Sequence, residues 1–218
     1  MLPRESDLNC NPGEITDPGP DPFFQMSRRL ILQLAALTFL LFGGGGLLLT
    51  THVRTVSLMD FLWGIAPLWR QVLAGLTFGL ICARGSWEIV QLPFMKHSHR
   101  LFAGIIAPMR LNMLEILFIS VCAGIGEELL FRGGLQPLLG IWPTSILFVL
   151  LHGYLNPFNL PLSVYGVYMI LVIGVMGLLT EHMGIITAIT AHVVVDVYLL
   201  YQLSGKPMGD DHPDENRQ

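Results

Sequence analysis

Long apolar runs, separated by short polar stretches, occupy most of the chain between residues 29 and 203. A helix needs about 17–25 mostly apolar residues to cross a bilayer, so we predict a transmembrane helix bundle of about six spans. The fourth span is short and should be tilted, broken or sheltered by its neighbours, and 57–65 should form a helix at the membrane interface. The expected spans cover 29–50, 68–91, 112–136, 143–157, 161–180 and 184–203.

The composition supports this all-α, polytopic fold class. Hydrophobic residues make up 52% of the chain and charged residues only 13%, whereas a soluble domain carries about 25% charged residues. The acidic, Pro- and Gly-rich segment 1–27 and the polar segment 206–218 are typical of solvated tails. One transmembrane domain over 28–205 is the simplest organisation. The sequence lacks a basic patch with interleaved aromatic residues, which argues against nucleic-acid binding.

The cysteines and glycines are predicted to have structural roles. Cys10, Cys82 and Cys122 are scattered and odd in number, so they indicate neither a disulfide framework nor a zinc-binding pair. We expect Cys82 and Cys122 to be buried as small apolar side chains. Gly75 and Gly79 form a G-x-x-x-G pair, a spacing that lets two membrane helices approach closely.

The distribution of basic residues predicts the orientation of the chain, because cytoplasmic loops carry an excess of Lys and Arg. We expect both termini in the cytoplasm, most simply at a bacterial inner membrane, and no cleavable signal peptide. Arg54 and Arg70 would then lie on the opposite side. The cytoplasmic set comprises Arg28, Arg29, Lys96, Arg100, Arg110 and Lys206.

Ionisable side chains interrupt three of the apolar spans. Each costs about 2.5–3.5 kcal/mol at the centre of a bilayer on insertion scales, so such residues usually pair, line a water-filled cavity or carry function. They lie in the third, fourth and sixth expected spans and comprise Glu127, Glu128, Arg132, His152, His192 and Asp196.

Helical spacing groups these residues into pairs. Glu128 and Arg132 are four residues apart, so they share a helix face and can form an ion pair. Glu127 lies about 100° around the helix from Glu128 and shares its face with Phe131. The same spacing of four recurs in Phe148 with His152 and in His192 with Asp196.

The depth of these residues in the bilayer connects the three spans. Because successive spans alternate in direction, the third, fourth and sixth bring Glu127, His152 and His192 to one level. At 1.5 Å per residue this level lies roughly 12–18 Å below the same membrane face. Residues far apart in the sequence are therefore expected to meet inside the bundle.

Each motif also has a purely structural interpretation when it is taken alone. His152 could bond a backbone carbonyl, and Glu128 with Arg132 could be a structural ion pair. His192 with Asp196 could be a helix-packing pair. Their common depth favours one functional cluster over three unrelated structural features.

The ordered motifs resemble those of the CPBP (ABI) family of intramembrane proteases, which includes the CAAX-prenyl endopeptidases. That family carries E-E-x-x-x-R, F-x-x-x-H and H-x-x-x-N/D in this order, and the resemblance covers residues 110–200. It implies a glutamate-dependent endopeptidase embedded in the membrane. The last motif ends in Asp196, where the eukaryotic prenyl endopeptidases have Asn. This difference favours the prokaryotic branch and makes a prenylated substrate less expected.

Peptide hydrolysis needs an activated water, a donor for the developing oxyanion and a proton for the leaving amine. We assign Glu127 as the general base, sharing the water with His152, although the roles of Glu127 and Glu128 could be exchanged. Glu128 would pair with Arg132 and hold the geometry of the site. The remaining assignments are His192 as the oxyanion donor and Asp196 as the residue that orients it or as a second polar contact.

Two other functions remain open from the sequence. Glu127, His152 and His192 could hold zinc or another divalent metal with an open coordination position, although no H-E-x-x-H helix motif is present. Buried ionisable residues also occur in proton-coupled transporters, and a protein of this kind could act as a membrane scaffold or immunity factor. Paired broken helices in two related halves, as transporters have, are not evident.

The expected partners follow from the position of the cluster. The substrate should be a membrane-anchored protein or peptide, cut near the bilayer face, and lipids should surround the bundle. The positive-inside orientation would place this site nearer the outer face. The sequence specifies neither the substrate nor the oligomeric state.

Overall fold

The computed structural model describes residues 26–55 and 57–205, and every regular element in these ranges is helical. The all-α prediction is confirmed. The tails expected over 1–27 and 206–218, with Cys10 and Lys206, lie outside the described residues apart from 26 and 27. The elements are α1 (Arg28–Thr38), the π-helix η2 (Phe39–Gly43), α2 (Gly44–Val53), α3 (Leu58–Trp63), α4 (Leu68–Val90), η3 (Pro93–Met95), α5 (Lys96–Ile106), η4 (Ala107–Met109), α6 (Met113–Glu128), the π-helix η5 (Leu129–Leu135), α7 (Gln136–Leu139), α8 (Ile141–Leu151), α9 (Leu160–His182) and α10 (Ile185–Leu203).

The transmembrane bundle is built from long apolar helices. Four helices are long and apolar enough to cross a membrane: the continuous helix Arg28–Val53, α4, α9 and α10. A fifth continuous helix runs from α6 through η5 to α7, and the shorter apolar helix α8 adds a sixth element. The segment 57–65 contains the short helix α3, as expected for a connection at the membrane interface.

The structure differs from the sequence expectation in two segments. α8 ends at Leu151 instead of reaching residue 157, and the chain turns at Gly153, which has a φ of 72°. The basic connection between α4 and α6, for which no regular element was predicted, contains the amphipathic helix α5. The sequence pattern could have predicted this helix, because the apolar residues Leu101, Phe102, Ile105 and Ile106 recur at helical spacing.

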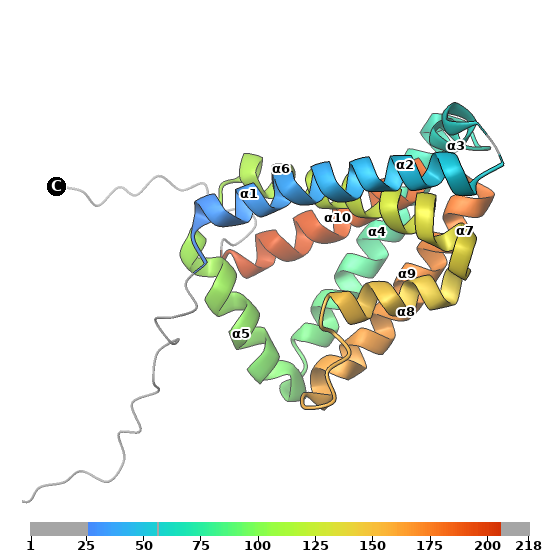
Figure 1. Cartoon of the computed structure of the whole chain (residues 1–218). Coiled ribbons are helices and arrows are strands. Elements are labelled where there is room, and N and C mark those ends of the chain that lie inside the picture. The colour runs from blue at the N-terminus through green and yellow to red at the C-terminus, as the bar shows by residue number, and fades with distance from the viewer. Residues whose placement is uncertain (1–25, 56, 206–218) are drawn as a thin grey trace, which may run out of the picture.

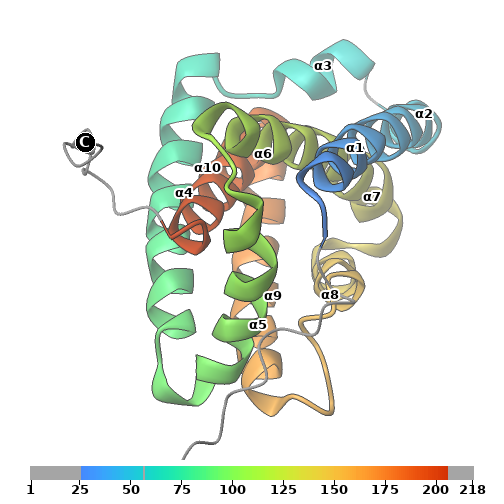
Figure 2. The ribbon, with the colours of Figure 1, turned by 90° about the vertical axis from the view of Figure 1, so that its left-hand side faces the viewer.

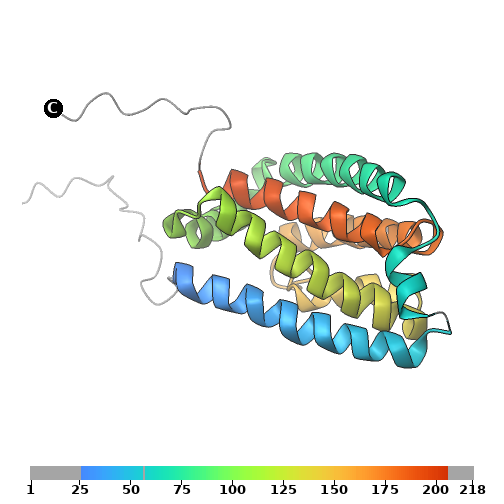
Figure 3. The same cartoon turned by 90° about the horizontal axis from the view of Figure 1, so that it is seen from above.

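The helices α1, α2, α6 and α10 run alongside one another, and α10 also packs closely on α4 (Figures 1 and 3). Gly75 and Gly79 make the second contact possible, because a Cβ on either would meet α10 backbone oxygens at 2.6 and 2.8 Å. The predicted packing role of this glycine pair is confirmed. In Figure 2, α5 lies in front of α9, on the side of the bundle where α1 begins.

A helix cap and an ion pair hold the start of α6 in place. Asn112 and Glu115 form a capping box, which satisfies backbone N–H groups that lack a partner at a helix start. Glu115 also forms an ion pair with Arg28 at the start of α1. The two helices therefore begin at the same end of the bundle. Cys82 and Cys122 are buried and not disulfide-bonded, as expected.

Candidate active site

A change from α- to π-helix positions the acidic residues of the third span. α6 ends at Glu128 and continues as η5, which contains Arg132. Single π-turns of this kind occur frequently at functional sites. The exposed fraction is 9% for Glu127 and 0% for both Glu128 and Arg132. Both neighbouring carboxylates and the guanidinium thus lie inside the bundle, where an unpaired charge would be costly.

Glu128 lies at the centre of a fully buried ionic network. Its Oε2 is 3.1 Å from Nε of Arg132, and its Oε1 is 2.9 Å from Nδ1 of His192. Arg132 also donates to the carbonyl oxygen of Ile173 on α9 at 3.3 Å. The predicted pair of Glu128 and Arg132 is therefore present. The nearest hydrogen-bond partner of His192 is Glu128, whereas the sequence pointed to Asp196.

Glu127 faces a second group of side chains. Its Oε2 lies 3.4 Å from Nε2 of His152 and 4.0 Å from Nε2 of His192. The same nitrogen of His192 is 3.5 Å from Oδ2 of Asp196. Oε2 of Glu127 is buried and has no hydrogen-bond partner among the described residues. This acceptor is therefore free to bind a further polar group between the two histidines.

Aromatic rings hold His152 in place at the end of α8. Its ring stacks on Phe148 with centroids 4.2 Å apart and an interplanar angle of 16°. Phe131 meets Phe148 edge-on at 4.8 Å. Nδ1 of His152 lies 2.8 Å from the carbonyl oxygen of Phe148. The two phenylalanines of the motifs thus form the wall against which the imidazole is oriented, with its Nε2 toward Glu127.

A cavity of about 290 Å³ adjoins the cluster, and Glu127, His152, His192 and Asp196 line one side of it. Apolar and aromatic side chains form the remainder of the wall. They come from the end of α4, from η3, α5 and α6, and from the end of α10. These lining residues include Trp87, Val90, Met95, Phe102, Ile106, Ile119, Leu199, Leu200 and Leu203.

The cavity extends from the cluster to Leu203 at the end of α10. This is also the end of the bundle where α1 begins (Figure 1). The expectation that the site lies nearer the outer face stays a prediction. Met26, Leu200 and Tyr201 pack against the same buried hydrophobic cluster. α8 ends at Leu151, and beyond His152 part of the cavity wall comes from Phe102 and Ile106 of α5.

Two tyrosines line the cavity although the sequence motifs did not predict them. Tyr154 follows the turn after His152, and Tyr165 lies on α9; both line the cavity. Their rings meet edge-on at 5.3 Å, and the ring of Tyr154 lies 5.7 Å from that of His152. Only the spacing of Tyr154 from the F-x-x-x-H motif could have suggested its proximity.

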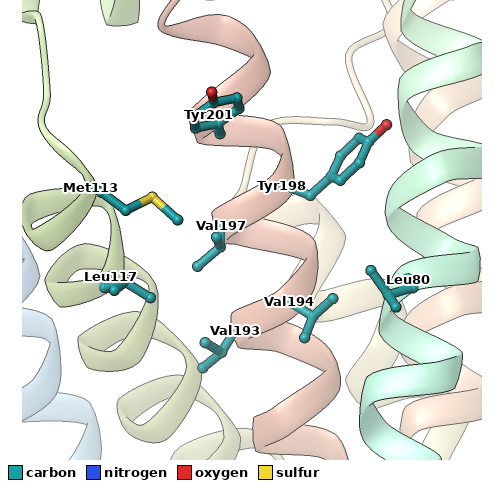
Figure 4. A pocket seen from close by; sticks show the side chains of 8 residues that line it. All are labelled: Leu80, Met113, Leu117, Val193, Val194, Val197, Tyr198 and Tyr201. Atoms are coloured by element: carbon teal, nitrogen blue, oxygen red, sulfur yellow. The ribbon is translucent and has the colours of Figure 1, made fainter. Parts of the chain in front are cut away.

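A larger apolar groove of about 570 Å³ lies elsewhere, between α4, α6 and α10 (Figure 4). Leu80, Leu117 and Val194 line it, and none of the candidate site residues does.

A metal site was the alternative interpretation of Glu127, His152 and His192. Within 26–55 and 57–205, the structure contains no group of three or more His, Cys, Asp or Glu side chains arranged to hold a metal ion.

Comparison with known proteins identifies the segment that contains the whole cluster. Residues 109–198 match the family model described as type II CAAX prenyl endopeptidase Rce1-like. The family resemblance is confirmed for this segment. The Rce1-like segment begins just before α6 and ends within α10, so it contains all six ionisable candidates but neither α1–α2 nor α5.

A curated relative extends the comparison to a second protein. The uncharacterized protein YpbD of Bacillus subtilis (strain 168) is 32% identical over 104 residues, which cover 47% of this chain and 52% of the relative. The chain thus spans about half the length of the relative that it matches. No solved structure matches the chain.

Proposed function

We propose that the protein is an intramembrane endopeptidase in which Glu127 activates a water molecule for peptide hydrolysis. One observation carries the proposal: an unpartnered carboxylate oxygen faces two imidazoles at the wall of a cavity inside an Rce1-like segment. A general base must lie within hydrogen-bond reach of the proton that it removes. Glu127 meets this condition for a water bound beside His152.

The hydrogen bonds around His152 define its part in this step. A carbonyl oxygen can only accept, so Nδ1 of His152 donates to Phe148. Its Nε2 then carries the lone pair of the neutral ring and accepts one hydrogen of the water. Glu127 takes the other proton as the water oxygen attacks the peptide carbonyl carbon. The proton passes from Glu127 to the leaving amine when the C–N bond breaks.

His192 is placed to stabilise the oxyanion. Its Nδ1 donates to Glu128, whose charge is balanced by Arg132. A proton on Nε2 is favoured by the carboxylates of Glu127 and Asp196, which both face this atom. The Nε2–H can donate to the carbonyl oxygen as negative charge develops there. Preorganised donors of this kind contribute about 2.7–4 kcal/mol to transition-state stabilisation.

The cavity lining supports a membrane-anchored substrate. Most of the wall is apolar and the polar groups are confined to one side, an arrangement that fits an apolar segment next to a scissile peptide bond. With both termini in the cytoplasm, the cavity would receive its substrate from the cytoplasmic half of the membrane. This orientation follows from the positive-inside rule.

The orientation is tested by labelling single cysteines in intact cells, in a Cys10→Ser background. Phe158 is 97% exposed and Ile65 79% exposed. Asn159 bonds to Ser98 of α5 at 3.1 Å, which places the Phe158 loop on the cavity side; Ile65 bonds to Met183 at the other end. A membrane-impermeant maleimide should label Ile65→Cys from outside and Phe158→Cys only after lysis. The reverse pattern would contradict the proposed orientation.

Proteolysis is tested with a library of membrane-anchored peptides. Wild type, Glu127→Ala and the control Glu88→Gln are purified in detergent, incubated with the library and analysed for new termini by mass spectrometry. Glu88 is a suitable control because it is exposed and pairs with Arg84 across one helical turn, outside the cavity lining. Termini that appear with wild type and Glu88→Gln but not with Glu127→Ala support the proposal. Identical termini in all three samples would contradict it.

Metal-free chemistry is tested on the same assay. Wild-type protein is treated exhaustively with EDTA and 1,10-phenanthroline, and its residual metal is measured by mass spectrometry. Cleavage at an unchanged rate in protein without stoichiometric metal is expected if Glu127 acts on water directly. Loss of cleavage that zinc restores would instead support the metal-dependent alternative with Glu127, His152 and His192 as ligands.

A further inference from the structure

Arg54 makes an unusual contact with the backbone of the π-helix. It follows α2 directly, and its guanidinium donates to two consecutive carbonyl oxygens, those of Arg132 at 2.6 Å and Gly133 at 3.1 Å. The guanidinium carbon lies 4.2 Å from the ring centroid of Phe61 on α3. Neither Arg54 nor Phe61 belongs to the Rce1-like segment 109–198.

The sequence explains why these two carbonyls need a donor. In an α-helix the carbonyl of Gly133 would accept from the N–H of residue 137, and in a π-helix the same N–H would serve the carbonyl of Arg132. Residue 137 is Pro137, which has no N–H. One proline thus removes the donor for both carbonyls at the point where η5 passes into α7.

The contact between α2 and η5 is close enough to bring Arg54 to this position. A Cβ on Gly133 would lie 2.3 Å from Oγ1 of Thr50, and a Cβ on Gly46 would lie 2.5 Å from the backbone of Leu129. Glycine at both positions therefore allows α2 to lie directly on the π-helix. Thr50 is itself buried, with an exposed fraction of 1%.

We propose that Arg54 is a positioning residue: it replaces the N–H that Pro137 lacks and fixes the π-helix that orients Arg132 and Glu128. The carbonyl that receives the shorter bond belongs to Arg132, whose side chain neutralises Glu128. Glu128 in turn bonds to Nδ1 of His192. The kinetic part of this proposal rests on the proposed protease function, whereas the structural part does not.

The experiment compares Arg54→Gln with its rescue by Pro137→Ala. The alanine restores an N–H at position 137, so the double variant should need Arg54 less than wild type does. The control is Arg70→Gln, which removes another arginine charge on the exposed side of α4. All variants are made in the full chain and purified in detergent.

The first readout is independent of catalysis. Histidine is labelled with ¹⁵N, and the Nδ1 signal of His192 is assigned by its loss in His192→Gln. We expect Arg54→Gln to shift this signal, the added Pro137→Ala to return it toward wild type, and the control Arg70→Gln to leave it unchanged. An unshifted His192 signal in folded Arg54→Gln would overturn the proposal, as would a shift of equal size in the double variant.

The second readout is kinetic. A displacement of about 1 Å in a catalytic group costs on the order of a hundredfold in rate, so kcat should fall about tenfold to a hundredfold in Arg54→Gln. KM should change less than twofold, and the double variant should recover most of the loss. If Arg54→Gln does not fold, it is introduced into the Pro137→Ala protein, where we expect it to fold; failure there would also overturn the proposal. Absence of cleavage in every variant, with the expected NMR shifts, would reject the protease function alone.

Discussion

Glu127 and Glu128 are adjacent on one helix, yet they belong to different surroundings. Glu128 is fully buried: its Oε1 is hydrogen-bonded to His192, and its Oε2 forms an ion pair with Arg132. Glu127 lines the cavity, which Glu128 does not, and its Oε2 faces two imidazoles instead of a guanidinium. Among the described residues, Oε2 of neither carboxylate has a hydrogen-bond partner. His192 connects the two sides, with Nδ1 toward Glu128 and Nε2 toward Glu127.

This difference separates two tasks that a buried carboxylate can have. A carboxylate that is neutralised by a guanidinium and sealed inside the bundle holds charge and geometry but lies out of reach of a bound substrate. A carboxylate that lines a cavity can accept a proton from a water molecule there. We therefore propose Glu127 as the base and Glu128 as the residue that holds His192, and the first prediction below tests this choice between the two roles that the motif left open.

The largest expected effect separates the two carboxylates by activity. Glu127→Gln keeps the shape of the side chain but removes the base, so the cleavage rate should fall by a factor of about 10²–10⁴. The free energy of unfolding should change by less than about 1 kcal/mol, because Glu128 and Asp196 remain beside the His192 imidazole when Glu127 loses its charge. Rates are measured on a peptide identified in the library assay, and unfolding by SDS titration. A rate within tenfold of wild type would contradict the assignment.

Glu128→Gln should have its main effect on stability. Removing one partner of a buried pair leaves the charge of Arg132 uncompensated, which costs about 3–5 kcal/mol. The free energy of unfolding is compared with that of Glu128→Gln/Arg132→Met, in which the stranded charge is also removed. The double variant should regain part of the loss. Equal stability of Glu128→Gln and wild type would show that the pair contributes nothing to the fold.

The sequence predicted the members of the site more completely than their roles. Spacing of four residues placed Glu128 with Arg132 and His192 with Asp196, and both pairs are present. The alternation of span directions predicted that Glu127 and the two histidines meet. These inferences succeed because helical periodicity and bilayer thickness leave few arrangements for ionisable residues.

What the sequence could not show depends on local departures from regular geometry. A π-helix after Glu128 cannot be recognised from periodicity, although Pro137 and the facing glycines are consistent with it. The early end of α8 and the helix α5 together determine where the cavity lies. α5 carries basic residues on a short amphipathic segment, and only tertiary packing makes Phe102 and Ile106 part of the site.

A smaller effect is expected from the aromatic wall behind His152. Phe148→Leu keeps an apolar side chain but removes the stacked ring, an interaction worth about 0.5–1.5 kcal/mol. The cleavage rate should fall about twofold to tenfold as His152 loses its fixed orientation. The control is Phe158→Leu, since Phe158 is exposed and does not line the cavity. A loss as large as that of Glu127→Gln would mean that Phe148 does more than orient the imidazole.

The smallest effect is expected at Asp196, on the cavity side of His192. Its Oδ2 lies 3.5 Å from Nε2, at the limit of hydrogen bonding, and Glu127 faces the same nitrogen. Asp196→Asn therefore removes one of two carboxylates near Nε2 but adds an amide that can donate to an oxyanion. These consequences oppose each other, so the cleavage rate should stay within about tenfold of wild type. Asp196→Leu, which removes the charge and supplies no donor, should be slower than Asp196→Asn. If Asp196→Asn were as inactive as Glu127→Gln, the free oxygen of Glu127 would not be enough to define the base, and the proton-accepting role would have to be shared between both carboxylates.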